Sequence, residues 1–289
     1  MASNELIVAY PGREGAHSAA ACDRLFPAAR LEPVPTFPDV VSAVASGRCA
    51  YGVLPIESSL SGSVSETHDL LFDSPLSIVA EAILSIRHCV VGTEAISLEE
   101  IREIHSHPVA LDQCRDLLAS LPNAHVTAAA TTGDAAAHIA ELRDPHVVAI
   151  ASERAARMHA LAVIAANVGD HPEAYTRFAA LAPYTRLDRR HGTWRTALTF
   201  VTDHRPGALH RAIEPLARRD IDMVQLVSRP IPSTPWKYRF DAVLGGHPLD
   251  EDVSGALAEM QQQTARLRVF GSYRADLEDQ SAASVAASA

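Results

Sequence analysis

The chain has 289 residues, with 35 Asp and Glu against 25 Lys and Arg, a formal net charge of −10 and a sequence pI near 5.7. This length corresponds to one large domain or two smaller ones. An acidic chain without a basic run is a poor candidate for nucleic-acid binding, and no apolar run approaches the ~18 residues that cross a bilayer. We therefore expect neither a nucleic-acid partner nor a membrane span.

The lysines and cysteines narrow the chemistry further. Lys237 is the only lysine, which argues against Schiff-base catalysis, and the absence of a Gly-Lys pair excludes a Walker-type phosphate loop. The cysteines lie far apart with no Cys-x-x-Cys pattern, and the N-terminus lacks the charged start and apolar core of a signal peptide. We expect reduced, buried thiols and a cytoplasmic location.

Residues 5–182 alternate between strand-like and helix-like segments. The expected strands are short, apolar and rich in Val and Ile, as buried strands of an α/β sheet are. They cover 6–10, 51–56, 77–91, 103–106, 126–130, 147–151 and 176–182. The expected helices lie between them, at 16–26, 39–46, 66–72, 108–121, 132–142 and 152–159. This alternation predicts a layered α/β region.

A polar stretch over 183–194 predicts a linker. The unit that follows it has a different order of predicted strands and helices. Its expected elements are a strand at 195–202, a helix at 207–218, strands at 221–229 and 236–244, a helix at 250–264 and a strand at 267–273. The order β-α-β-β-α-β is typical of a ferredoxin-like fold. The tail from Asp276 is rich in Ser and Ala without periodicity, so we expect it to be disordered.

The common catalytic and metal-binding signatures are absent from the sequence. There is no Gly-x-Gly-x-x-Gly, no His-Glu-x-x-His and no Gly-x-Ser-x-Gly. Fourteen histidines raise the question of a metal site, and His88, His105 and His107 were the ones to consider. No carboxylate or third histidine stands at ligand spacing from them. We therefore expect no metal site.

Four polar clusters stand where predicted strands end. Segment 12–18 contains glycines before a helix, which can bring backbone N–H groups to an anion. Segment 54–64 is dense in hydroxyl groups, and segment 106–114 opens a helix. Arg177 is flanked by apolar residues and needs an anion, either a bound carboxylate or an internal one. Each cluster also fits a plain structural part: a turn, a Ser-rich loop, a helix cap or a salt bridge.

Taken together and in this order, the clusters resemble the prephenate dehydratase family. Its Gly-x-x-Gly-x-x-Ser turn is similar to 12–18, its Pro-Ile-Glu-Asn-Ser…Gly-x-Val segment to 55–64, and its Ser-His-Pro-Gln-Ala-Leu-x-Gln-Cys segment to 106–114. Its Thr-Arg-Phe signature stands unchanged at 176–178. Segments 206–209 and 228–230 match the two motifs with which ACT regulatory domains bind phenylalanine. The resemblance covers about residues 5–273.

The resemblance implies a fold and a reaction. The fold is α/β, with a two-lobed, periplasmic-binding-protein-like catalytic domain over 4–185, a ferredoxin-like βαββαβ ACT domain over 195–274 and a loose tail over 275–289. The reaction converts prephenate to phenylpyruvate, carbon dioxide and water in L-phenylalanine biosynthesis, without a cofactor. The substrate is a dianion, so its pocket must supply cationic or N–H donors.

The family's site residues carry over motif by motif. Thr176 stands at the departing hydroxyl, Arg177 is the carboxylate clamp, and Phe178 walls the pocket. Ser106 and Gln113 orient substrate oxygens. The other expected site residues are Ser58 in the catalytic set, and Glu57, Ser59, Ser18 and His107 around the substrate.

Several positions depart from the family pattern and leave alternatives open. Ser58 replaces the usual Asn, and Val109 replaces the usual Gln. The turn at 15–18 reads Gly-Ala-His-Ser, closer to the Gly-Ala-Tyr-Ser of arogenate dehydratases, so arogenate is an alternative substrate. A prephenate decarboxylase is a further alternative, although that reaction keeps the hydroxyl and has less need of Thr176. A ligand sensor without catalysis is the alternative of another class, since fold does not fix function.

The ACT motifs imply an effector site for L-phenylalanine. Its expected contacts are Pro206, Gly207, Ala208, Leu209, Ser228, Arg229 and Pro230. The Glu that usually precedes Ser-Arg-Pro is Val227 here. ACT units pair edge to edge with the effector between them, and a four-stranded sheet leaves open edges. We therefore expect a homodimer or homotetramer that L-phenylalanine inhibits.

Overall fold

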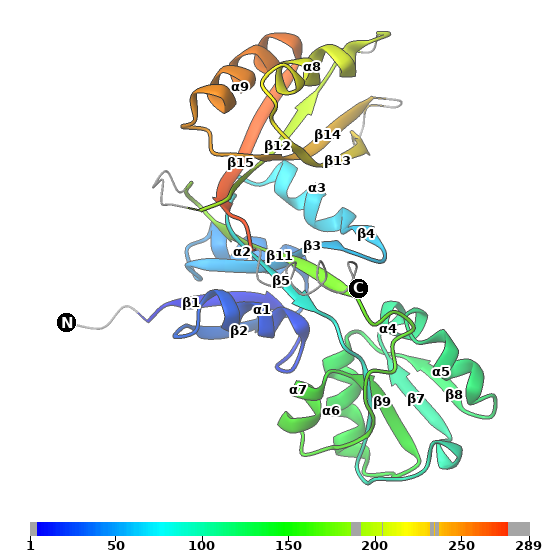
Figure 1. Ribbon diagram of the computed structural model, residues 1–289. Coiled ribbons are helices and arrows are strands. Elements are labelled where there is room, and N and C mark those ends of the chain that lie inside the picture. Colours follow the sequence, from blue (N-terminus) through cyan, green and yellow to red (C-terminus); the bar gives the residue numbers. More distant parts are fainter. Residues whose placement is uncertain (1–4, 186–191, 204, 232–233, 235–236, 277–289) are drawn as a thin grey trace.

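The computed structural model describes residues 5–185, 192–203, 205–231, 234 and 237–276. These residues form three sheets with helices packed on them. Figure 1 shows three units in a row: a C-terminal unit in yellow to red, a middle lobe mostly in blue and cyan, and a second lobe in green. The middle lobe contacts both of the others.

The first lobe is built on a six-stranded sheet in the order β2-β1-β3-β11-β5, with β4 paired to β3. Strands β1, β2 and β3 are parallel, and β11 runs antiparallel to both β3 and β5. The bounds are β1 Ile7–Pro11, α1 His17–Leu25, β2 Arg30–Val34, α2 Phe37–Ala45, β3 Tyr51–Ser58, β4 Gly62–Ser63, α3 Ser65–Asp73, β5 Ser77–Ser85 and β11 Tyr175–Ala182. The sheet is covered by apolar clusters on both faces, as a central α/β sheet requires.

The second lobe has a five-stranded sheet in the order β10-β6-β9-β7-β8. Its central strand β9 (Val147–Ala151) is buried along its whole length, because α6 (Thr132–Leu142) covers one face and α4 and α5 lie on the other. The remaining bounds are β6 Cys89–Gly92, the short 3₁₀-helix Leu98–Glu100, β7 Glu103–Ser106, α4 Pro108–Asp112, α5 Arg115–Ser120, β8 His125–Ala128, α7 Glu153–Met158 and β10 Ala162–Ala165.

The chain passes twice between the two lobes. It leaves the first lobe after β5 to enter β6, and it returns from β10 to β11. Strand β11 then inserts between β3 and β5 in the first sheet, so the two lobes are interleaved in sequence. The expected two-lobed, periplasmic-binding-protein-like fold is confirmed by this topology.

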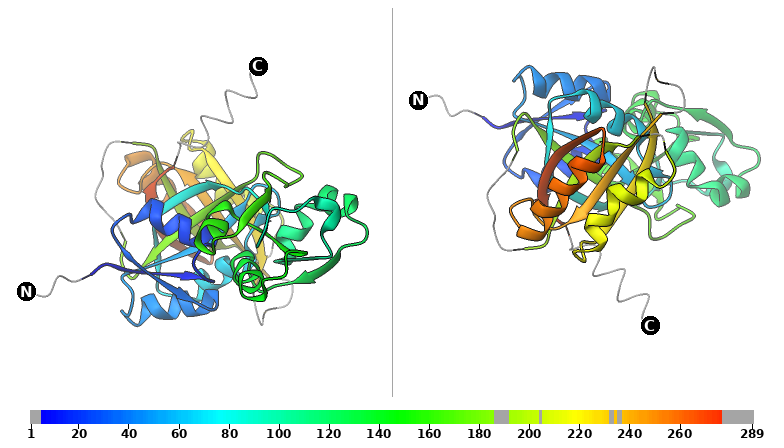
Figure 2. Two further views of the ribbon diagram at one scale, coloured as in Figure 1. Left: turned by 90° about the horizontal axis from the view of Figure 1, so that it is seen from below. Right: turned by 90° about the horizontal axis from the view of Figure 1, so that it is seen from above.

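The C-terminal unit is a four-stranded antiparallel sheet in the order β13-β14-β12-β15. Helices α8 and α9 cover the face turned away from the first lobe (Figures 1 and 2). The bounds are β12 Trp194–Val201, α8 Ala208–Ala217, β13 Met223–Pro230, β14 Tyr238–Gly245, α9 Glu251–Gln263 and β15 Arg266–Arg274. The predicted βαββαβ order is confirmed. The other face packs against α3 and β5, where Phe270 and Tyr273 join the same apolar cluster as Leu76 and Ile78.

Two expected elements are each divided in two. The strand expected at 77–91 is two strands, β5 and β6, in different sheets, because the chain crosses between the lobes at 86–88. The helix expected at 108–121 is broken into α4 and α5. The break occurs where Asp170 accepts the N–H groups of Arg115 (2.9 Å) and Asp116 (3.1 Å), which starts a new helix from outside the segment.

Strands β2 and β10 were not expected from the sequence. Strand β2 holds Pro33 and two charged side chains and lies at a sheet edge, so it lacks a central strand's apolar signal. Asp276 was expected in a disordered tail, but it is held against the first lobe. Its carboxylate accepts the N–H of Ile83 at 2.9 Å and pairs with Arg24 at 2.9 Å. Residues 186–191 of the linker expected at 183–194, and residues 277–289 of the expected tail, lie outside the described residues.

The four cysteines are free and buried. In the part of the chain that the structure describes, no helix has the length and apolar character needed to cross a membrane. The same residues contain no group of three or more His, Cys, Asp or Glu side chains that could hold a metal ion.

Candidate active site

A cleft of about 530 Å³ opens between the two lobes. The first lobe lines it with the turn after β1, the start of α2, the β3–β4 hairpin and β11. The second lobe lines it with the starts of α4 and α6. Of the expected site residues, Thr176, Phe178, Ser58, Ser18, His107 and Gln113 line this cleft.

Strand β11 presents alternate side chains to the cleft. Thr176 and Phe178 face it, and Phe178 is almost fully buried. Ser58 lies opposite Thr176 in the pairing of β3 with β11. The Ser58 hydroxyl oxygen accepts the N–H groups of Leu60 (3.3 Å) and Ser61 (3.4 Å), which fixes it at the hairpin. Two hydroxyl groups therefore stand side by side on neighbouring strands at the cleft wall.

Ser59 does not line the cleft. Its hydroxyl oxygen accepts the N–H of Tyr175 at 2.9 Å and its O–H reaches the Glu173 carbonyl at 3.5 Å. The expected role of Ser59 at the substrate is therefore corrected. Its hydroxyl group joins the β3–β4 hairpin, which contains Ser58, to the start of β11, which contains Thr176.

The second lobe contributes His107 and Gln113 at the two ends of α4. His107 is the N-cap residue, and its Nδ1 accepts the N–H of Val109 at 3.2 Å. This contact places the ring proton on Nε2, and burial lowers the His107 pKa. Gln113 Oε1 lies 2.8 Å from His88 Nε2, so His88 donates and the amide nitrogen of Gln113 is turned away from His88.

Ser106 is placed elsewhere. It is fully buried, it does not line the cleft, and its hydroxyl donates to the Ile150 carbonyl at 2.6 Å. Ser106 ends β7 and Ile150 lies in the neighbouring strand β9. The expectation that Ser106 orients a substrate oxygen is corrected, because its proton is used to join two strands.

Sequence reasoning passed over two histidines of the cleft. His17 lies in segment 12–18, where the family resemblance indicates only Ser18 as a substrate contact. His88 raised only the question of a metal site in the sequence. The two rings meet edge to face, with centroids 6.1 Å apart. Burial, and secondarily His88, lowers the His17 pKa to about 4, and burial also lowers the His88 pKa. Both rings are therefore neutral near pH 7.

The cleft offers anion-binding groups without a cationic side chain. Among the described residues that line it there is no Lys or Arg, and Glu66 is the single acid. The N-cap residues of five helices line it instead: Ala16 of α1, Thr36 of α2, Val64 of α3, His107 of α4 and Thr131 of α6. Helix N-termini present free N–H groups and a positive dipole end to an anion. The Thr36–Asp39 and Thr131–Asp134 pairs are capping patterns that could have been found in the sequence.

Arg177 does not line the cleft. Its side chain leaves β11 on the opposite face, where Nε lies 3.2 Å from Glu57 Oε2 and Nη1 lies 3.3 Å from Glu81 Oε2. The expectation that Arg177 clamps a substrate carboxylate, with Glu57 beside the substrate, is corrected: the anions that Arg177 needs are internal. The physical reason is the two-residue period of a strand, which sends Thr176 and Arg177 to opposite faces.

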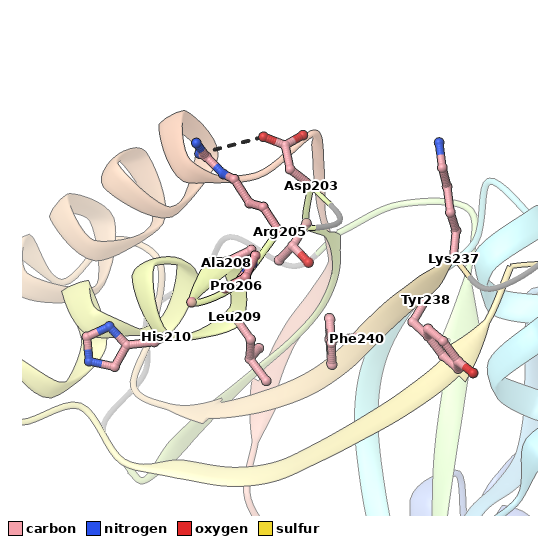
Figure 3. Close-up of a pocket in the computed structure, with 11 residues that line it drawn as sticks. Asp203, Arg205, Pro206, Ala208, Leu209, His210, Lys237, Tyr238 and Phe240 are labelled. Carbon is pink, nitrogen blue, oxygen red and sulfur yellow. Dashed lines mark ion pairs between the residues drawn. The ribbon is translucent and has the colours of Figure 1, made fainter.

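A second pocket, of about 590 Å³, lies on the C-terminal unit. Pro206, Gly207, Ala208 and Leu209 line it, as expected for an effector site (Figure 3). Leu209, Tyr238 and Phe240 make it apolar on one side. The other lining residues are Thr202, His210, Lys237 and the pair formed by Arg205 and Asp203 at 3.6 Å. The pocket therefore combines apolar surface with charged side chains of both signs.

The other half of the expected effector site lies apart from this pocket. Ser228, Arg229 and Pro230 do not line it; they lie on the edge strand β13. Arg229 instead turns to the first lobe, where Nη2 lies 2.7 Å from Asp69 Oδ2 and Nη1 lies 2.5 Å from Ser65 Oγ. Within one chain the seven expected effector contacts therefore do not line one pocket, and the Arg229 side chain holds α3.

A family model described as prephenate dehydratase matches residues 8–185, which contain the whole cleft. The chain belongs to the prephenate dehydratase family. The match includes every cleft residue named above, from Ala16 to Phe178.

Similar proteins support this membership over nearly the full chain. An arogenate dehydratase/prephenate dehydratase of Arabidopsis thaliana is 32% identical over 278 residues, 93% of this chain and 73% of that protein. A bifunctional chorismate mutase/prephenate dehydratase of Enterobacter agglomerans is 33% identical, and the match covers 82% of this chain and only 61% of that protein. A solved prephenate dehydratase from Arthrobacter aurescens, in complex with L-Phe, superposes with a TM-score of 0.85 at 28% identity, covering 98% of this chain and 97% of that one.

Proposed function

We propose that the chain catalyses the decarboxylating dehydration of prephenate to phenylpyruvate. The observation that carries this proposal is the position of the Thr176 hydroxyl group, beside Ser58 and across the cleft from the second lobe's Gln113 and His107, within the region matched to the family. Relatives of the chain bear the names of prephenate and arogenate dehydratases.

The reaction needs a proton at one oxygen and little else from the protein. The bond from the ring to its carboxylate breaks and releases carbon dioxide, its electron pair enters the ring, and the C4 hydroxyl departs with its own bonding pair. Aromatisation drives these changes. Because hydroxide is a poor leaving group, the departing oxygen must be protonated so that water is released. A threonine is too weak an acid to supply that proton alone, so Thr176 donates a hydrogen bond to the departing oxygen and relays a proton that comes from solvent water.

We infer that uncharged N–H groups bind the substrate dianion. The N-termini of α1, α2 and α6 supply backbone N–H groups, and Gln113 and His107 supply side-chain N–H groups. The net charge of −10 gives no long-range attraction for an anion, so attraction is local. Oriented N–H dipoles interact more strongly with an anion in a protein cleft than in bulk water, because the effective dielectric constant is lower there.

A side-by-side assay of prephenate and arogenate tests this function. We expect phenylpyruvate from prephenate with the larger kcat/KM. The turn at 15–18 and the name of the Arabidopsis relative support arogenate as the second candidate, with phenylalanine as its product. Formation of a decarboxylated product that keeps the hydroxyl would instead identify a prephenate decarboxylase.

We further propose that residues 195–274 form an ACT regulatory domain that binds L-phenylalanine and inhibits the enzyme. The pocket at Pro206–Leu209 combines apolar surface with the acidic Asp203 and the basic Arg205 and Lys237, which suits a zwitterionic amino acid with an aromatic side chain, and the Arthrobacter relative was solved with L-Phe. The edge strand β13 exposes Ser228 and Pro230 together with Val224 and Leu226. Pairing of two such edges in a homodimer or homotetramer would bring 228–230 of one copy to the pocket of the other. The buried free cysteines agree with a cytoplasmic enzyme.

A further inference from the structure

An ion-pair ladder lies on the face of the first sheet opposite the cleft. Arg177 forms its centre, with Glu57 on one side at 3.2 Å and Glu81 on the other at 3.3 Å. The three side chains come from neighbouring strands: Glu57 from β3, Arg177 from β11 and Glu81 from β5. Arg177 therefore ties together β3, β11 and the edge strand β5 of the sheet.

Both ends of the ladder are held by the C-terminal unit. Gln225 of β13 donates its amide N–H to Glu57 Oε1 at 2.7 Å. Arg195 of β12 donates to Glu81 Oε1 at 2.6 Å, and the backbone N–H of Asp276 donates to the same oxygen at 2.9 Å. The order of contacts is thus Gln225, Glu57, Arg177, Glu81, Arg195.

Burial makes the ladder hard to rearrange. The Glu81 side chain is only 1% exposed and that of Arg177 is 16% exposed. Burial raises the Glu81 pKa, and the positive charges of Arg177 and Arg195 oppose this rise. Two acids face two arginines, so the charges balance, and removing either arginine would leave a buried carboxylate short of a partner.

The ladder residues are direct chain neighbours of the two cleft hydroxyl groups. Thr176 precedes Arg177, and Ser58 follows Glu57, in strands that pair with Thr176 opposite Ser58 and Arg177 opposite Glu57. Successive side chains of a strand point to opposite faces, so a shift of Arg177 on one face moves Thr176 on the other.

We propose that Arg177 is a positioning residue that sets the Thr176 and Ser58 hydroxyl groups for the reaction, and that Gln225 and Arg195 of the C-terminal unit hold it in place. The inference rests on the proposed dehydratase function. It makes the rate of the chemical step depend on how the C-terminal unit docks on the sheet.

Replacement of Arg177 by lysine tests the positioning role, because Lys keeps the charge but cannot hold two carboxylates with a rigid fork. We expect Arg177→Lys to lower kcat for prephenate by about 10- to 100-fold, as a misplaced catalytic group does. The KM for prephenate and the calorimetric Kd for phenylpyruvate are expected to stay within about threefold of wild type. The control is Arg157→Lys, since Arg157 forms an exposed pair with Glu153.

Replacement of Gln225 tests the contribution of the C-terminal unit. Gln225→Leu removes one hydrogen bond to Glu57, and we expect kcat to fall about 3- to 10-fold at unchanged KM. Gln262→Leu on the exposed side of α9 is the matched control. An unchanged kcat in Arg177→Lys, a KM raised at constant kcat, or a Gln225→Leu variant equal to wild type overturns the proposal. A wild-type chain that makes no phenylpyruvate overturns the proposed function instead.

Discussion

Gly271 offers the sharpest test of how the C-terminal unit docks on the catalytic sheet. It lies in β15, where that strand crosses β5 of the first lobe. A Cβ atom at this position would lie 2.1 Å from the Ile78 carbonyl oxygen and 3.0 Å from the Ile78 backbone N and C atoms. The backbone φ of 155° is also unfavourable for a residue with a side chain. Gly271→Ala therefore requires the two strands to separate.

The size of the effect follows from this overlap. A carbon and an oxygen atom need about 3 Å or more, so β15 and β5 must move apart by about 1 Å, and a backbone carbonyl cannot turn aside as a side chain can. Overpacking costs about 1–3 kcal/mol, and we expect the upper end here. That corresponds to a fall in Tm of about 6 °C or more. Because the same docking holds the Arg177 ladder, kcat for prephenate is expected to fall as well.

Gly245→Ala is the matched control. Gly245 ends β14 in the same unit, and a Cβ there would meet nothing nearer than Asp222 Cβ at 3.6 Å. Thermal unfolding followed by circular dichroism, with prephenate turnover on the same samples, compares the two variants. A Gly271→Ala protein that melts within about 1 °C of wild type with full activity would refute the close approach of β15 to β5.

Three further predictions follow from the two pockets. Burial lowers the pKa of His17 from 6.5 to about 4, so the folded state holds this ring neutral. Its contribution to the free energy of unfolding is full above pH 6.5 and is lost as the pH falls toward 4. Unfolding measured at several pH values should show a smaller loss for His17→Phe than for wild type, and an identical loss would refute the buried, neutral state of His17. Leu209→Asp places a carboxylate in the C-terminal pocket and should weaken inhibition by L-phenylalanine at least 10-fold, while kcat stays within about twofold of wild type. Inhibition curves equal to those of wild type would refute the assignment of this pocket to the effector. Gln113→Ala removes a donor to the substrate dianion and should lower kcat/KM for prephenate about 10-fold or more, with a wild-type value as the contrary result.

The sequence predicted the scaffold well where signals are local. The helix expected at 132–142 and the strands expected at 103–106 and 147–151 have those bounds in the structure. The capping Thr131 marks the start of the helix, and the strand at 147–151 is a fully apolar run. The broken helix at Gln113–Cys114 could not be predicted, since the carboxylate that starts α5 belongs to Asp170, 55 residues beyond Arg115.

The sequence predicted several residues that line the cleft, but it did not predict which face of a strand or which partner the other expected site residues would take. Strand periodicity alone separates Thr176 from Arg177, so the sequence contained the reason why both could not face one cleft. The partners of Arg177 could not be predicted, because Glu81 lies 96 residues away and Gln225 lies in the C-terminal unit. The resemblance of 106–114 to the family motif assigned Ser106 to the substrate, yet its hydroxyl group donates to the Ile150 carbonyl. Such pairings depend on register between strands, which no local pattern encodes.

The most direct test of the account is the rate of phenylpyruvate formation from prephenate by wild type, Thr176→Val and Thr176→Ser. Val keeps the shape of Thr and removes only the hydroxyl group, whereas Ser keeps the hydroxyl. We expect wild type to form phenylpyruvate, Thr176→Val to lose about 100-fold or more in kcat at similar KM, and Thr176→Ser to retain most of the rate. A Thr176→Val protein that makes phenylpyruvate at the wild-type rate would contradict the central claim.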